Sequence, residues 1–233
     1  VMNAMTTQMF VDFGRICREI SRSESVRVVV ITGAGGNFCS GADVGGQGSQ
    51  ANSGKKHVHI KSMRQISESV LALNEIPYPV IAKIRGVAAG AGMNLALGCD
   101  ILIASETARF SEIFARRGLS IDFGGSWLLP RQIGLHRAKE LVLMADVIDS
   151  AEADRIGLVN RIVAEEELDM AKRDYRHAQD MVVRTNDDRL EHWEQEVVGK
   201  KHLEKWRAKL VWNSMRSMMR FYELDRIICW DLS

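Results

Sequence analysis

Two stretches of small residues offer backbone N–H groups to a ligand. Residues 37–43 (NFCSGAD) follow the β-branched run 28–31, and residues 86–98 (GVAAGAGMNLALG) follow the apolar segment 79–84. The second stretch continues into a helical apolar pattern, and the first N–H groups of a helix have no intrahelical partner. Free N–H groups from the two loops could together stabilise a developing oxyanion. The alternative is close packing of two backbone segments.

The glycines at 33–36 do not make a nucleotide site. A dinucleotide-binding fingerprint needs G-x-G-x-x-G/A leading into a helix, with an acid about 20 residues further on. Phe38 stands at the third glycine position, and the next acid after Asp43 is Glu68. The GKK stretch at 54–56 lacks the first glycine and the Ser or Thr of a phosphate-binding loop. We reject both nucleotide interpretations.

The ordered set of motifs resembles the crotonase (enoyl-CoA hydratase/isomerase) superfamily. The matching segments, within residues 2–168, are VVVITGAGGNFCSGADV, IPYPVIAKIRGVAAGAGMNLALGCDILIAS, ARFSEIFARRGLSIDFGGSWLLPRQIG and AEADRIGLVNRIVAEEEL. The resemblance implies an α/β fold, a crotonase-like spiral of ββα units, assembled as a homotrimer or homohexamer. It also implies that the ligand is an acyl-CoA thioester. No metal and no separate cofactor are implied, because coenzyme A is part of the substrate.

The same resemblance implies that two backbone N–H groups polarise the thioester carbonyl and stabilise an enolate. By motif, these donors fall on Ser40 and Ala91. Bulky substitutions in the two loops are therefore expected to block the approach of the thioester. The residues expected to bind substrate and CoA are Phe38, Gly41, Ala42, Asp43, Gly90, Gly92, Phe114 and Trp127.

The two glutamates with which hydratases of this family handle water are absent. Their positions carry Asn94 and Phe114, neither of which can transfer a proton. This departure argues against ordinary hydration. Asp122 resembles the position of a catalytic aspartate in some relatives, including dienoyl-CoA isomerases. Its apolar neighbours are expected to raise its pKa and favour a role as base; the alternative is a helix N-cap before Gly124.

Two further polar residues complete the expected catalytic set. Asn94 is expected to hydrogen-bond substrate or water, or to cap local backbone. Glu112 is the rival carboxylate, although its offset from Phe114 favours an ordinary surface role. Asp43 and Asp100 are expected to be mainly structural. The predicted reaction shifts a double bond in an enoyl-CoA, with hydration or non-catalytic acyl-CoA binding as alternatives.

Alternating strands and helices must position these residues. The apolar spacing predicts helices at 4–22, 60–73, 126–134 and 136–144, strands at 28–31, 79–84 and 99–104, and a capping box at 149–152. This alternation indicates βαβ units. Residues 1–168 are expected to form the crotonase-like core, and the charge-dense residues 169–233 a C-terminal helical region. The first residues match an internal segment of the family pattern, so we expect a preceding strand pair to be missing.

Composition excludes several classes of partner. A net charge of +1, with 46% hydrophobic and 26% charged residues, favours no nucleic acid or membrane surface. No apolar run reaches the length of a membrane span, and the default location is cytoplasmic. The scattered Cys17, Cys39, Cys99 and Cys229 are expected to be buried free thiols. The basic residues Lys55, Lys56, His57 and His59 could meet the phosphates of CoA or lie in a solvated loop.

Overall fold

The computed structural model of the chain describes residues 2–23, 26, 28–43 and 56–169. From residue 170 on, the predicted C-terminal helical region lies outside the described residues, as do Lys55 and Cys229. The side chains of Lys56, His57 and His59 lie outside them as well, so the expected contact with CoA phosphates stays a prediction.

The described chain mixes strands and helices. The strands are β1 Val29–Thr32, β2 Val80–Ile84, β3 Val87–Ala89, β4 Ile101–Ser105, β5 Arg109–Ser111, β6 Ile148–Asp149 and β7 Arg161–Val163. The α-helices are α1 Thr7–Ser21, α2 Lys56–Asn74, α3 Ala91–Leu97, α4 Gly125–Ile133, α5 Leu135–Met144 and α6 Ser150–Arg155. Two 3-10 helices complete the set, η2 Ile113–Arg117 and η3 Glu167–Asp169. The predicted βαβ arrangement is present at β1-α2-β2, while β2 and β3, and β4 and β5, follow each other directly.

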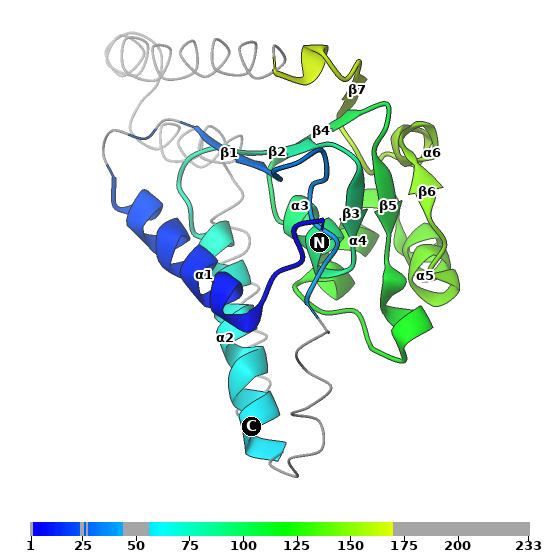
Figure 1. Cartoon of the computed structure of the whole chain (residues 1–233). Helices are drawn as coiled ribbons and strands as arrows, with labels where there is room; N and C mark the ends of the chain where they lie inside the picture. The colour runs from blue at the N-terminus through cyan, green and yellow to red at the C-terminus, as the bar shows by residue number, and fades with distance from the viewer. Residues whose placement is uncertain (1, 24–25, 27, 44–55, 170–233) are drawn as a thin grey trace, which may run out of the picture.

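The strands form two sheets. The larger sheet has the order β1-β2-β4-β7 with every pair parallel, and the smaller has the order β3-β5-β6. Parallel neighbours need crossover connections, and α2 supplies the one between β1 and β2. Helix α3 leads from β3 in the smaller sheet to β4 in the larger one (Figure 1). The chain thus changes sheets at α3, the helix that begins at Ala91.

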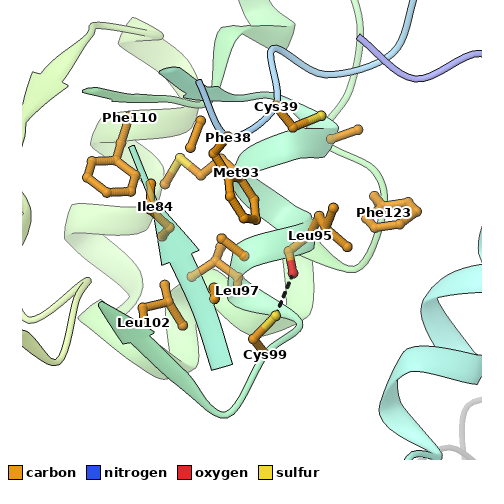
Figure 2. Packing of buried hydrophobic residues seen from close by; sticks show 14 of the residues in the cluster. Phe38, Cys39, Ile84, Met93, Leu95, Leu97, Cys99, Leu102, Phe110 and Phe123 are labelled. Atoms are coloured by element: carbon orange, nitrogen blue, oxygen red, sulfur yellow. Dashed lines mark hydrogen bonds between the residues drawn. The ribbon is translucent and has the colours of Figure 1, made fainter. Parts of the chain in front are cut away.

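Helix α3 is buried along its whole length, which explains its continuous apolar sequence. Figure 2 shows its residues Met93, Leu95 and Leu97 packed among side chains from the strands and loops around it. Cys99 follows the helix and donates from Sγ to the Leu95 carbonyl at 3.4 Å. The thiols at 17, 39 and 99 are buried and free, as predicted.

The smaller sheet was not expected from the sequence pattern. Strand β3 is only VAA, and its small residues carry no β-branched run. It pairs in parallel with β5, with Ala88 opposite Phe110 and Ala89 opposite Ser111. The N–H of Gly90 then donates to the Ser111 carbonyl at 2.8 Å. This pairing brings the start of α3 next to the residue that precedes Glu112.

Helices α1 and α2 lie side by side at the edge of the sheets (Figure 1). The buried face of α1 consists of Phe10, Gly14 and Cys17. A Cβ at Gly14 would lie 3.0 Å from Cα of Ser69, so the glycine allows close approach of the two helices. The helices predicted at 4–22 and 60–73 are thus confirmed with shifted ends. Among the described residues, no helix combines the length and apolarity that a membrane crossing requires.

The predicted cap at Asp149, at the start of α6, is confirmed, whereas the Glu152 carboxylate accepts hydrogen bonds from Arg155 in place of the return bond of a capping box. The Asp149 carboxylate accepts a hydrogen bond from the Glu152 N–H at 2.8 Å. We expect Asp149→Ala to lower the free energy of unfolding by about 1 kcal/mol, because a first-turn N–H loses its acceptor. Urea denaturation of the full chain measures this change. Asp154→Ala, at an exposed position inside the same helix, is the control; an equal loss there would contradict a capping role.

Candidate active site

The two small-residue loops lie in direct contact. The Cys39 N–H donates to the Val87 carbonyl and the Ala89 N–H donates to the Cys39 carbonyl, both at 2.9 Å. A Cβ added at Gly92 would lie 2.1 Å from the carbonyl oxygen of Cys39. No side chain fits there, so glycine at this position is what allows the first loop to lie against the start of α3.

The residue after Ser40 also touches the start of α3. Gly41 has a φ of +102°, which favours glycine. A Cβ there would lie 2.9 Å from the Ala89 carbonyl oxygen and 3.6 Å from the Ala91 nitrogen. The backbone at 40–41 is therefore adjacent to the backbone at Ala91, as the proposed oxyanion hole requires.

The two expected donors differ in their hydrogen bonding. Ala91 is the first residue of α3, and no described residue accepts from its N–H. The Ser40 N–H, by contrast, donates to the Met2 carbonyl at 3.0 Å. The expectation of an open donor at Ser40 is thus not met in this structure. Met2 and Asn3 have φ values of 47° and 55°, a region that is uncommon for Met and more readily adopted by Asn.

The residues expected to bind substrate and CoA fall into two groups. Phe38 is buried in the main hydrophobic core (Figure 2), where it packs against protein, and its contact with substrate stays a prediction. Phe114 is buried beside Gly90, at the start of α3. Ala42 and Asp43 are exposed and run alongside Met5, with the Asp43 N–H donating to the Met5 carbonyl.

Trp127 and Asp100 have clear structural contacts. Trp127 is half-buried on α4, and the Arg131 guanidinium stacks on its ring with 2.9 Å between its central carbon and the ring centroid. One Asp100 carboxylate oxygen accepts from the Val80 N–H at 2.8 Å, which agrees with the predicted structural role.

Asp122 lies on a tight turn in front of α4. The next residue, Phe123, has a φ of 48°, and its buried ring packs against Phe10 with 5.2 Å between centroids. The alternative of a helix N-cap is wrong, because Gly124 caps α4 and no side chain completes the cap. Burial raises the pKa of Asp122, as its apolar setting predicted. Its Oδ1 atom is buried and has no hydrogen-bond partner among the described residues.

Asn94 connects α3 to the turn that carries Asp122. Its Nδ2 donates to the Asp122 main-chain carbonyl at 2.9 Å, and that carbonyl also accepts from the Gly125 N–H. A Cβ at Gly125 would lie 2.3 Å from Asn94 Oδ1, so the helices meet closely there. The recorded contact is with backbone, one of the two predicted roles. Within the described chain, no group donates to Asn94 Oδ1, so this oxygen can accept a hydrogen bond from substrate or water, the second predicted role.

Glu112 is the largest departure from expectation. Its predicted surface position is wrong, because its side chain is 0% exposed. The cause is the unexpected pairing of β5 with β3, which places Glu112 beside the buried start of α3. The pKa of Glu112 is raised to about 8: burial is the largest cause, the charge of Asp122 also raises it, and the contact with the Asn94 amide lowers it. Neither carboxylate oxygen has a hydrogen-bond partner of suitable geometry among the described residues.

Comparison with known proteins identifies the family. Residues 1–191 match the enoyl-CoA hydratase/isomerase sequence family. This chain belongs to the enoyl-CoA hydratase/isomerase family. The crotonase resemblance found in the motifs is thereby confirmed, and so is the α/β crotonase-like fold.

The similar proteins of this family are named for two different reactions, isomerisation and hydration. The chain is 34% identical to 1,2-epoxyphenylacetyl-CoA isomerase of Escherichia coli, over 76% of this chain and 68% of that protein. It is 40% identical to a probable enoyl-CoA hydratase of Rhodobacter capsulatus, over 68% of this chain and 60% of that protein. The crystal structure of a candidate enoyl-CoA hydratase from Thermobifida fusca in complex with CoA is 32% identical, with a TM-score of 0.70 over 97% of this chain and 87% of that one.

The matched region is shorter than these curated relatives. It covers about three fifths of the length of the Rhodobacter capsulatus protein and 68% of the Escherichia coli isomerase. Family membership and fold therefore stand on the comparisons, and the reaction of this family member is argued below from its own residues.

Among the residues predicted for the site, two pairs are in contact. The backbone at 40–41 lies beside Ala91, and Asn94 holds the main chain of Asp122. The sequence-based prediction placed Glu112 on the surface. Its position pointed the other way, because Glu112 directly follows Phe110 and Ser111, which are both buried in strand β5. Among the described residues, no group of three or more His, Cys, Asp or Glu side chains could hold a metal ion.

The raised pKa of Glu112 predicts a pH-dependent stability. Below its ordinary pKa of 4.5, Glu112 is protonated in both the folded and the unfolded chain. Between 4.5 and about 8 the unfolded chain loses this proton while the folded chain keeps it, so the free energy of unfolding falls as pH rises. We expect Glu112→Gln to remove this part of the fall, on the order of a few kcal/mol.

Urea denaturation at about pH 5 and about pH 8 measures the effect. Glu140→Gln, at an exposed position on α5, is the matched control and should follow the wild type at both pH values. Equal pH dependence in the wild type and in Glu112→Gln would show that Glu112 ionises normally in the folded protein.

Proposed function

We propose that this chain processes acyl-CoA thioesters and shifts a double bond in an enoyl-CoA through an enolate. The observation that carries the proposal is the position of Asp122. The Asn94 side chain holds the main-chain carbonyl of Asp122, and Asn94 lies about one helical turn after Ala91 on α3. The carboxyl group of Asp122 and the Ala91 N–H, which could bind the thioester oxygen, are therefore held by the same helix. A proton acceptor and an oxyanion donor fixed relative to each other are what enolate chemistry needs.

In the proposed reaction, the ionised Asp122 carboxylate removes a proton from the acyl chain. The C–H bond breaks, an O–H bond forms on Asp122, and the electron pair moves into an enolate. The Ala91 N–H stabilises the enolate oxygen. The Ser40 N–H joins it once the thioester oxygen replaces the Met2 carbonyl as its acceptor. Asp122 then returns the proton to the other end of the allylic system.

The comparisons support the substrate class and both candidate reactions. The Thermobifida fusca relative was crystallised with CoA, and the Escherichia coli relative is named an isomerase of a CoA thioester. The Rhodobacter capsulatus relative is named as a probable hydratase. Hydration is therefore the second candidate, because the unpartnered oxygens of Asn94 and Glu112 could accept hydrogen bonds from a bound water.

Incubation of the full chain with 2-enoyl-CoA and 3-enoyl-CoA tests the proposal. We expect 3-enoyl-CoA to be converted to its 2-enoyl isomer, followed by absorbance and mass spectrometry. A gain in mass of one water, without migration of the double bond, would favour hydration. Binding of acyl-CoA without turnover of either thioester would make the chain a non-catalytic binding protein, and absence of binding would refute the substrate class.

Assembly, cofactor and location complete the proposal. We propose a homotrimer or homohexamer, as the family resemblance implies, in a cytoplasmic setting. We also propose that CoA enters as part of the substrate and that the reaction needs no metal. Sedimentation of the full chain measures the assembly, and activity in the presence of a chelator measures the metal requirement.

A further inference from the structure

A buried thiol lies beside one of the two expected oxyanion donors. Cys39 directly precedes Ser40 in the first small-residue loop, and its side chain belongs to the main hydrophobic core (Figure 2). Its Sγ atom accepts a hydrogen bond from the Gly41 N–H, with 3.4 Å between sulfur and nitrogen. This bond closes a three-residue turn that has Ser40 at its centre.

The backbone of Cys39 is fixed by the second small-residue loop. Its N–H donates to the Val87 carbonyl and its carbonyl accepts from the Ala89 N–H, both at 2.9 Å. These two bonds form the bridge that pairs Cys39 with Ala88. Because the peptide group is planar, a fixed Cys39 carbonyl also sets the direction of the Ser40 N–H.

The Cys39 side chain lies against the start of α3 as well. A Cβ added at Gly92 would lie 2.8 Å from the Cys39 Cβ. Gly92 follows Ala91, whose N–H is the second expected donor. Cys39 therefore contacts the helical turn that carries one donor and closes the loop turn that carries the other.

The conformation of Gly41 explains why the turn needs an anchor. Its φ of +102° favours glycine, whose backbone can adopt more conformations than that of any other residue. The Gly41 carbonyl accepts from the Met5 N–H at 2.8 Å, and the Gly41 N–H is held by the sulfur of Cys39. Without the sulfur, the peptide group between Ser40 and Gly41 could rotate more freely.

We propose that Cys39 is a positioning residue of the oxyanion hole: its sulfur holds the Gly41 N–H, so that the Ser40 N–H keeps the direction in which it stabilises the enolate oxygen together with the Ala91 N–H. The inference deepens the proposed function and rests on it, since it assumes that these two N–H groups bind the thioester oxygen.

A neutral oxygen can replace the sulfur in this role. Burial raises the pKa of Cys39 and outweighs the hydrogen bond from Gly41, which lowers it, so the thiol stays neutral. A serine hydroxyl is also neutral and commonly accepts from the N–H two residues further on. Cys39→Ser therefore keeps an acceptor for the Gly41 N–H, whereas Cys39→Ala removes it.

Kinetics with 3-enoyl-CoA separate positioning from packing. Cys39→Ala should lower kcat about tenfold and leave KM nearly unchanged, because the donors act most strongly on the enolate; loss of a whole donor costs about 10²–10³-fold. Cys39→Ser should recover most of the rate. Cys17→Ala, which removes a buried thiol from α1, is the matched control and should keep the wild-type kcat.

Wild-type kcat in Cys39→Ala, or an equal loss in Cys39→Ala and Cys17→Ala, would overturn the proposal. A Cys39→Ser variant as slow as Cys39→Ala would overturn it too, because the acceptor would then not matter.

The infrared carbonyl band of a bound saturated acyl-CoA, isotope-labelled at the thioester carbonyl, reports on the donors without turnover. Hydrogen bonds to the thioester oxygen lower the frequency of this band. We expect the full lowering in the wild type, Cys39→Ser and Cys17→Ala, and a smaller one in Cys39→Ala. An equal lowering in Cys39→Ala and the wild type would overturn the proposal.

Hydrogen exchange of the Gly41 amide, followed by nuclear magnetic resonance, tests the N–H to sulfur bond without any thioester. Exchange should be slow in the wild type and in Cys39→Ser, and faster in Cys39→Ala. Equally fast exchange in the wild type and Cys39→Ala would overturn the proposal. If exchange behaves as expected but the wild type does not lower the frequency of the thioester band, the turn at Cys39 stands and the proposed function fails.

Discussion

Asp122→Asn is expected to lower kcat for double-bond migration by about 10²–10⁴-fold, the usual contribution of a general base. Asparagine has nearly the same shape but cannot accept the substrate proton. The main-chain carbonyl that Asn94 and Gly125 hold is unchanged by the substitution, so the turn should keep its conformation. Binding of acyl-CoA should therefore persist, because the loops and α3 are untouched.

Steady-state kinetics with 3-enoyl-CoA and calorimetric titration with a saturated acyl-CoA measure the two effects separately. Asp154→Asn makes the same chemical change at an exposed position of α6 and should leave both values as in the wild type. If Asp122→Asn turns over at the wild-type rate, the base is another group, and the enolate mechanism through Asp122 must be abandoned. If Asp122→Asn loses both acyl-CoA binding and turnover, Asp122 would instead be needed to maintain the shape of the binding site.

Gly92→Ala is expected to disrupt the site through its backbone. The added Cβ would lie 2.1 Å from the Cys39 carbonyl oxygen and 2.8 Å from the Cys39 Cβ, so the two loops must separate. Overpacking of this kind costs about 1–3 kcal/mol of stability. The separation would also displace the Ser40 and Ala91 N–H groups, and misplacement by about 1 Å can cost about 10²-fold in rate.

Urea denaturation and kinetics with 3-enoyl-CoA measure the two losses. Gly157→Ala is the matched control: Gly157 has a φ of +76° with nothing within 4 Å of an added Cβ. That substitution should cost stability through backbone strain, about 1–2 kcal/mol, but leave kcat unchanged. A fall in kcat in Gly157→Ala equal to that in Gly92→Ala would mean that lost stability, and not displaced donors, explains the loss of rate.

The sequence alone determined the features that depend on local pattern. Helical spacing and β-branched runs predicted α1, α2, α4, α5 and three strands of the larger sheet, β1, β2 and β4, because periods of 3.6 and 2 residues are set by the neighbouring backbone. The helix cap at Asp149 was predictable for the same reason, since the N–H group that donates to its carboxylate belongs to a residue three positions further on. The small-residue loops and Asp122 were found through their order along the chain, which resembles a known family.

Only the tertiary structure decided which side chains are buried together and which backbone N–H groups already donate a hydrogen bond. Strands β3 and β5 are three residues each, too short for a periodic signal, yet their pairing moves Glu112 from an expected surface position to a fully buried one. The hydrogen bond from the Ser40 N–H to the Met2 carbonyl likewise joins residues far apart in sequence. Burial and the pKa of Glu112 depend on such long-range contacts, which no local pattern of residues specifies.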